Sequence, residues 1–230
     1  MTNRLFSLFT AGMAAFALLT GAAPAPDPLL GRIVADARAI APAGLAFERL
    51  SRIVTQEDGG AAKTSVRVDR WDGRSFALIS VDGKAPPAKE SEDFRKLAAS
   101  RPIPGYHRLG DFLKGGATRL ADAQGRIIYR VTGLPKGTVN VGKDVSASLT
   151  GEFTVDASGA QPYVTRARLI LPKPLSFFLV AKLDSLDIVF DYRLDGNGRP
   201  YLAHVVQTLS GAQFGKQGST RTETSYTMLR

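Results

Sequence analysis

Apolar residues recur at helical spacing in three parts of the chain. Between residues 29 and 40 they stand at positions 29, 30, 33, 34, 37 and 40, and Pro42 and Gly44 end the run. This spacing predicts an amphipathic helix. A second helix is predicted over 87–99, where prolines precede acidic and then basic residues, the charge order that the helix dipole favours. The segment 106–113 predicts a short helical turn with its apolar side chains facing inward.

Elsewhere the pattern changes to strict alternation, which predicts strands. In 186–194 every even position is apolar, while Asp187, Asp191 and Arg193 face the other way, as in a half-buried antiparallel strand. Asp72-Gly73 lies between two such runs and predicts a hairpin turn. About ten strands follow from this pattern, over 45–55, 64–71, 74–81, 117–121, 126–132, 145–156, 163–171, 186–194, 201–209 and 220–229.

These elements define the expected fold class. It is mainly β with a few helices: a strongly curved antiparallel sheet, or incomplete barrel, covered by an N-terminal helix and an inserted helix. A long sheet with one apolar face must curl around that face or be covered by helices. An immunoglobulin-like sandwich fits less well, because it has no place for two amphipathic helices.

The N-terminus has the order of a secretory signal peptide. A positive residue, Arg4, precedes an apolar run that gives way to small residues by residue 25. We expect a cleaved signal over 1–25, with cleavage after residue 22 or 23 as alternatives, and a single β-rich domain over 26–230. The expected location is the periplasm, with secretion, or retention of the segment as an anchor, as alternatives.

The composition narrows the class of protein. The chain has no cysteine, which excludes disulfides, thiol catalysis and a lipid-accepting cysteine, so we expect a soluble product that does not span the membrane after cleavage. Its net charge of +9 suits anionic surfaces. The basic residues are scattered and not interleaved with aromatic ones, so nucleic acid is not an expected partner. A basic, solvated surface is the simpler interpretation.

No residue pattern indicates catalysis, a metal site or a cofactor. His107 and His204 are the only histidines, and no further ligands stand at zinc-binding spacing. Asp187 and Asp191 would lie about 13 Å apart along a strand, too far for paired glycosidase carboxylates. No nucleophile elbow or phosphate loop occurs. The expectation is a protein that is not an enzyme, with an unrecognised hydrolase as the alternative.

The order of elements resembles the outer-membrane lipoprotein-sorting family, the LolA/LolB-like fold. The segment 149–156 and the hairpin from Phe190 to Val206 are similar in style to such envelope proteins. The resemblance implies a curved sheet with a helical lid around an apolar cavity that shields acyl chains. It transfers no functional residue to this chain. Without a lipidated cysteine, it favours a soluble carrier over an anchored receptor.

Two functions follow from this interpretation. The first is a soluble envelope protein that carries a lipid or lipoprotein acyl chain in a cavity lidded by the helix at 29–40. The second is an interaction module with a packed core that binds an envelope protein partner.

Phe177 and Phe178 lie in an apolar stretch that predicts either a mobile lip or an ordinary buried connection. The expected cavity wall is Leu149, Phe153, Val155, Leu186, Ile188, Phe190 and Tyr192.

Overall fold

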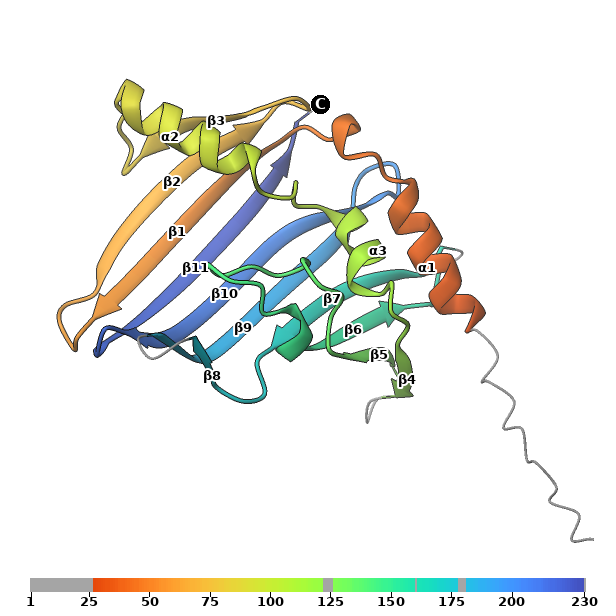
Figure 1. The fold of residues 1–230 in the computed structure, drawn as a ribbon. Coiled ribbons are helices and arrows are strands. Elements are labelled where there is room, and N and C mark those ends of the chain that lie inside the picture. Colours follow the sequence, from red (N-terminus) through yellow and green to blue (C-terminus); the bar gives the residue numbers. More distant parts are fainter. Residues whose placement is uncertain (1–26, 122–125, 160, 178–180, 230) are drawn as a thin grey trace, which may run out of the picture.

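In the computed structural model, which describes residues 27–121, 126–159, 161–177 and 181–229, one open antiparallel sheet curves around a hollow face (Figure 1). Within these residues the sheet has eleven strands and is accompanied by three α-helices, which confirms the expected fold class. The strands are β1 (Phe47–Glu57), β2 (Lys63–Trp71), β3 (Phe76–Val81), β4 (Thr118–Ala121), β5 (Ile127–Thr132), β6 (Thr150–Asp156), β7 (Tyr163–Ile170), β8 (Leu175–Phe177), β9 (Ala181–Leu194), β10 (Pro200–Gln213) and β11 (Lys216–Met228).

The predicted helices form close to their expected bounds. They are α1 (Pro28–Ala39), α2 (Ala88–Ala99) and α3 (Leu109–Phe112). Short 3-10 turns occur at η1 (Pro42–Gly44), η2 (Tyr106–Arg108) and η3 (Ser146–Ser148). The expected signal peptide over 1–25 and the expected lip residue Phe178 lie outside the described residues. Among the described residues, no helix is long and apolar enough to cross a membrane.

β1 and β11, the first and the last of the described strands, are neighbours in the interior of the sheet. The strand order runs β3-β2-β1-β11-β10-β9-β7-β6-β5-β4, with β8 pairing beside β7 on β9. β1 pairs with β11 from Phe47 opposite Met228 to Glu57 opposite Gly218. β3 and β4 are the outer strands, and within the described part of the chain no pairing between them closes the sheet.

The main core lies on the concave face of β5, β6, β7 and β9. There α1, η2 and α3 pack over the sheet, together with the segment that follows β5 (Figure 1). Tyr106, Leu109, Phe112 and Leu113 are all buried, as the pattern over 106–113 predicts. Tyr106 also connects η2 to the sheet, because its phenol oxygen accepts a hydrogen bond from the Val164 amide of β7 at 2.9 Å.

A second, smaller core lies beneath α2 at the other end of the sheet. It contains Phe47, Trp71 and Phe76, with Ala98 of the helix. The rings of Trp71 and Phe76 are 4.8 Å apart between centroids. The inserted helix therefore covers only the ends of β1, β2 and β3, and leaves the middle of the sheet between the two cores uncovered (Figure 1).

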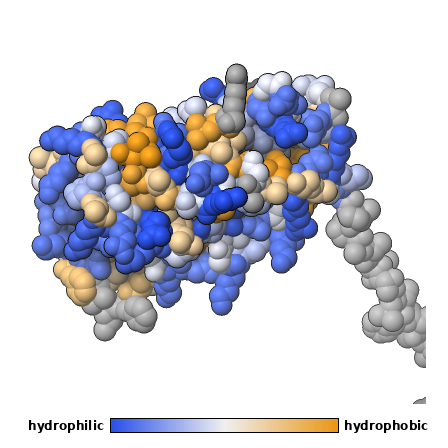
Figure 2. Space-filling model, turned by 90° about the horizontal axis from the view of Figure 1, so that it is seen from above, coloured by the Kyte–Doolittle hydropathy of each residue, from blue (hydrophilic) through white to orange (hydrophobic). Residues whose placement is uncertain are grey.

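The convex face is exposed to solvent, and ion pairs on it connect side chains of neighbouring strands. Arg130 pairs with Glu152 at 2.7 Å and Arg168 with Asp187 at 2.7 Å. Such exposed pairs contribute little individually. From above, apolar patches are interrupted by hydrophilic side chains (Figure 2). The large apolar side chains that are exposed among the described residues are Leu50, Ile79, Leu97, Leu194, Phe214 and Leu229.

Three local predictions need correction or refinement. The turn after β2 uses four residues, because Trp71 pairs with Phe76 and the Asp72 carboxylate accepts hydrogen bonds from the amides of residues 74 and 75. The expected strand over 145–156 begins only at Thr150, since η3 precedes it. The stretch around Phe177 forms the short strand β8.

The N-terminus of α1 is fixed to the sheet by one carboxylate. Asp27 caps the helix, because its Oδ1 accepts from the Leu29 amide at 2.9 Å. Its Oδ2 accepts from the hydroxyl of Tyr129 on β5 at 2.8 Å. Burial of Asp27 acts to raise its pKa, but these hydrogen bonds and the charge of Arg119 outweigh burial and hold the pKa below its usual range. The same side chain thus both starts the helix and sets where it lies.

We expect Tyr129→Phe to lower the free energy of unfolding by about 1–2 kcal/mol, the range for a hydrogen bond to a charged group. The substitution removes the donor to Asp27 and leaves the ring packed. Urea unfolding followed by circular dichroism measures the change. Tyr163→Phe is the control, because the Tyr163 hydroxyl has no hydrogen bond within the described ranges. Equal effects of the two substitutions would contradict the anchoring role of Tyr129.

Candidate ligand groove

A hollow of about 870 Å³ opens on the concave face between the two cores. Its floor comes from β9, β10 and β11, including Ile188, Phe190 and Val205. Its walls include Phe112 of α3 and the segment 100–105 after α2. Ligand pockets typically measure about 300–1,000 Å³ and are mostly apolar with a few polar groups. This hollow has both the size and the mixed lining of such a site.

The segment 137–142 forms another wall of the hollow, and it is fixed by a few polar contacts. The Asp144 carboxylate accepts from the Gly137 amide at 2.9 Å and from the Ser146 amide at 3.0 Å. The Ser146 hydroxyl oxygen accepts from the Val139 amide at 2.9 Å, and the side chains of Ser146 and Val139 are buried. The wall of the groove is therefore a built feature rather than a loose connection.

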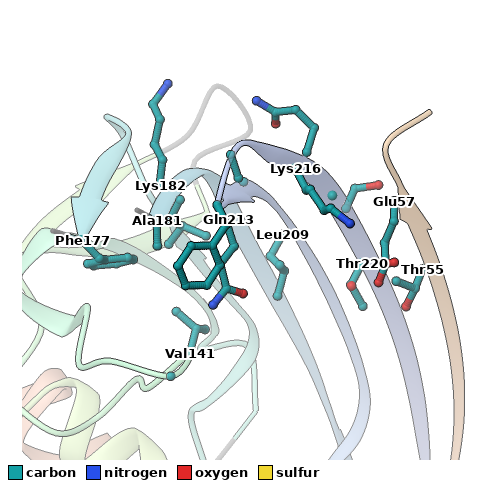
Figure 3. Close-up of a pocket in the computed structure, with 18 of the residues that line it drawn as sticks. Thr55, Glu57, Val141, Phe177, Ala181, Lys182, Leu209, Gln213, Lys216 and Thr220 are labelled. Atoms are coloured by element: carbon teal, nitrogen blue, oxygen red, sulfur yellow. The ribbon is translucent and has the colours of Figure 1, made fainter. Parts of the chain in front are cut away.

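A second hollow of about 1030 Å³ lies at the far end of β10 and shares Val141, Gly142 and Leu209 with the first. Phe177 and Val141 lie on one side of it, and Thr55, Glu57 and Thr220 lie on the other (Figure 3). Because the two hollows share residues, we treat them as one groove along the concave face. We call it the concave groove.

The concave floor changes from apolar to polar along one line of paired residues. We call this line the transverse row, and successive members face one another in the strand registers. Its buried end lies under α1 and α3, and its open end lies toward α2. It consists of Tyr129, Phe153, Ala167, Phe190, Val205, Thr224, Ser51 and Arg67.

The polar half of the row is organised by hydrogen bonds. Ser51 and Thr224 share a bond of 3.0 Å between their hydroxyls. The neighbouring row, two residues further along the strands, continues the change, since Ile188 faces Gln207 and Gln207 faces Thr222. Hydroxyl and amide groups therefore become frequent on the floor from β10 toward β1.

A buried ion pair closes this polar end of the floor beneath α2. Asp69 is 2% exposed, and the Arg49 guanidinium approaches its Oδ1 at 2.7 Å. The same guanidinium lies 4.7 Å from the centroid of Phe76. Burial raises the pKa of Asp69, and the positive charge of Arg49 opposes that rise. A buried carboxylate of this kind depends on its partner.

The expected cavity residues divide into two groups. Ile188, Phe190 and Tyr192 line the concave groove, and Phe177 lines its far end. The other four, Leu149, Phe153, Val155 and Leu186, line neither hollow and are at most 4% exposed; they lie in the main core, to which Ile188 and Tyr192 also belong. A ligand-binding role for these residues remains a prediction.

The structure adds groove residues that the sequence interpretation did not name. Val205 and Gln207 of β10 form the centre of the floor. Arg67 extends the transverse row, although it stands between the apolar Val66 and Val68. Alternation in 64–71 was the only signal available, and it does not say which face of a strand is concave.

The two histidines lie apart from the groove lining. His204 faces the convex side, where its Nδ1 lies 3.7 Å from Asp191 Oδ2 and its register partner on β11 is Ser225. Asp191 also pairs with Arg166 at 3.1 Å, so its charge is shared. Burial lowers the pKa of His107. Among the described residues, no group of three histidine or acidic side chains could hold a metal ion.

Comparison with known proteins gives little beyond this geometry. No family model matches the sequence, and no curated protein matches it significantly. Among solved structures, the chain matches a LolA superfamily protein from Nitrosomonas europaea at 15% identity, over 87% of this chain and 93% of that chain, with a TM-score of 0.34. The fold class described above rests on the strands and helices themselves.

We expect Arg49→Met to lower the free energy of unfolding by about 3–5 kcal/mol at neutral pH, because Asp69 stays buried without its partner. In this variant the folded-state pKa of Asp69 lies above its unfolded value. The folded state then binds the proton more tightly, so stability falls as the pH rises through the folded pKa. Urea unfolding should therefore show a smaller loss at about pH 4 than at about pH 7.

A double variant and an exposed pair serve as controls. Arg49→Met with Asp69→Leu should recover most of the stability, since apolar replacement of a buried ion pair is often neutral. Arg70→Met breaks the exposed pair with Glu48 and should cost less than about 1 kcal/mol. A loss in Arg49→Met that is independent of pH and not rescued by the double variant would contradict the role assigned to the pair.

Proposed function

We propose that this protein binds an amphiphilic lipid or lipoprotein acyl chain in the concave groove and carries it within the cell envelope. The observation that carries the proposal is the open floor of β9 and β10. Phe190 and Val205 lie there in a hollow, although the adjoining parts of the same face are packed under helices. Burial of each methylene on such a floor contributes about 0.8 kcal/mol, so a chain of ordinary length supplies useful affinity.

The cellular part of the proposal comes from the sequence. The order of charged, apolar and small residues over 1–25 is typical of a periplasmic or secreted protein. The absence of cysteine removes the usual acceptor for a lipid anchor. We therefore propose a soluble periplasmic carrier, and the pattern-level resemblance to the lipoprotein-sorting family points the same way.

A second candidate function has its own supporting observation. Six of the seven expected cavity residues, all except Phe190, are buried members of the main core, so much of the concave face is filled by side chains. A filled interior suits a module that acts through its surface on an envelope protein partner. Native mass spectrometry of protein purified from its host separates the two functions, because a carrier should retain lipid and a surface module should not.

Filling the groove tests the proposal directly. Val205 faces the groove, whereas Val206, its neighbour on β10, faces the convex side opposite Val189. We expect Val205→Trp to weaken binding of the fluorescent apolar probe N-phenyl-1-naphthylamine at least about tenfold, or about 1.4 kcal/mol, because the indole occupies the floor. Fluorescence titration measures the affinity.

Val206→Trp is the matched control and should bind the probe within about twofold of the parent protein. Melting temperatures of both variants establish that they are folded. Equal affinities in all three proteins would place the probe elsewhere. Absence of any saturable binding to the parent protein would count against a lipid carrier and in favour of the surface module.

A further inference from the structure

The open end of the transverse row holds an arginine without a bonded partner. The Nε of Arg67 is buried and has no hydrogen bond within the described residues. Its guanidinium lies 5.8 Å from the ring centroid of Phe94 on α2, and this ring contact provides no acceptor for the Nε–H. Buried donors are almost always bonded, so the unpaired Nε–H of Arg67, on the concave face of β2, indicates a missing acceptor.

The nearby carboxylate is already engaged. Asp69 stands two residues from Arg67 on the same face of β2, but its Oδ1 already lies 2.7 Å from both Nε and Nη2 of Arg49. The charged side chains on this part of the concave floor are thus two arginines and one aspartate, with a net charge of +1. The polar end of the floor is electropositive.

The charged side chains on the elements packed around the groove do not make the net charge of this region negative. Arg101 and Arg108 line the same hollow. Arg108 pairs with Asp111 at 2.6 Å, whereas Arg101 adds positive charge. Glu57 lines the far end of the groove, where Lys182 and Lys216 also lie. An anion is favoured next to Arg67, because guanidinium groups match carboxylate and phosphate oxygens.

We infer that the ligand of the concave groove is an anionic amphiphile, whose carboxylate or phosphate head binds Arg67 and whose hydrocarbon chain lies on Val205 and Phe190. This inference rests on the proposed function and names its ligand class. β2 and β10 are three strand spacings apart, or about 14 Å, and the concave curvature brings the side chains that face inward closer together. Ser51 and Thr224 lie between the two ends and offer hydroxyls to the linking part of the ligand.

Displacement of N-phenyl-1-naphthylamine by three ligands with the same chain tests this assignment. Laurate and dodecyl phosphate carry anionic heads, and dodecanol is neutral. In the parent protein we expect both anions, or one of them, to compete more strongly than dodecanol, and the stronger competitor identifies the head. In Arg67→Gln the anionic preference should fall about tenfold, while competition by dodecanol stays unchanged.

Two further variants control for charge and for folding. Arg70→Gln removes the same charge from the same strand on the opposite face, where Arg70 pairs with Glu48, and should keep the anionic preference. Arg67→Lys keeps the charge and should retain part of that preference. Melting temperatures confirm that each variant is folded.

The possible failures are distinguishable. If the parent protein binds the probe but prefers no anion, or if Arg67→Gln and Arg70→Gln behave alike, the assignment of Arg67 is overturned and the lipid-binding function stands. If the parent protein binds neither the probe nor any of the three amphiphiles, the proposed function fails, and the inference fails with it.

Discussion

An open sheet that curves around one face must either cover that face or make it polar, and this constraint determines the rest of the structure. Exposed apolar area costs roughly 25 cal/mol per Å², so uncovered apolar floor is unfavourable over large areas. Here α1, α3 and the segment after β5 cover the strands from β5 to β9. Where no helix lies over β1 and β11, the floor carries hydroxyls such as Ser51 and Thr224.

The concave groove lies at the border between the apolar part of the face that helices cover and the polar part that they leave open. On one side Phe190 continues the buried row of Phe153 and Ala167, and on the other side the row passes into Thr224 and Arg67. A hollow at such a border suits a molecule that is itself divided into an apolar and a polar part. The same division explains why much of the expected cavity wall is packed: those residues lie on the covered side.

Much of the fold could be predicted from the sequence, because local periodicity specifies helices and strands. The helix at 29–40 and the strand at 186–194 carry patterns that have a single interpretation. The groove was harder to predict, because alternation does not say which side of a strand is concave. In β2 the apolar Val66 and Val68 lie on the convex face while Arg67 and Asp69 lie on the concave face, opposite to the usual expectation. Only the pairing of β1 with β11 and β2 fixes that choice.

That pairing also governs how the molecule can assemble. β1 and β11 come from opposite ends of the chain, with Phe47 facing Met228, and contacts between such distant segments slow folding because a long loop must close first. Until β11 is in place, the ribbon of β1, β2 and β3 and the block from β4 to β10 are two separate pieces, each with an unpaired strand edge. Of the eleven described strands, β11 is the last to be synthesised, and it is the one that joins them. Trimming the C-terminus would therefore divide the sheet in two rather than shorten it.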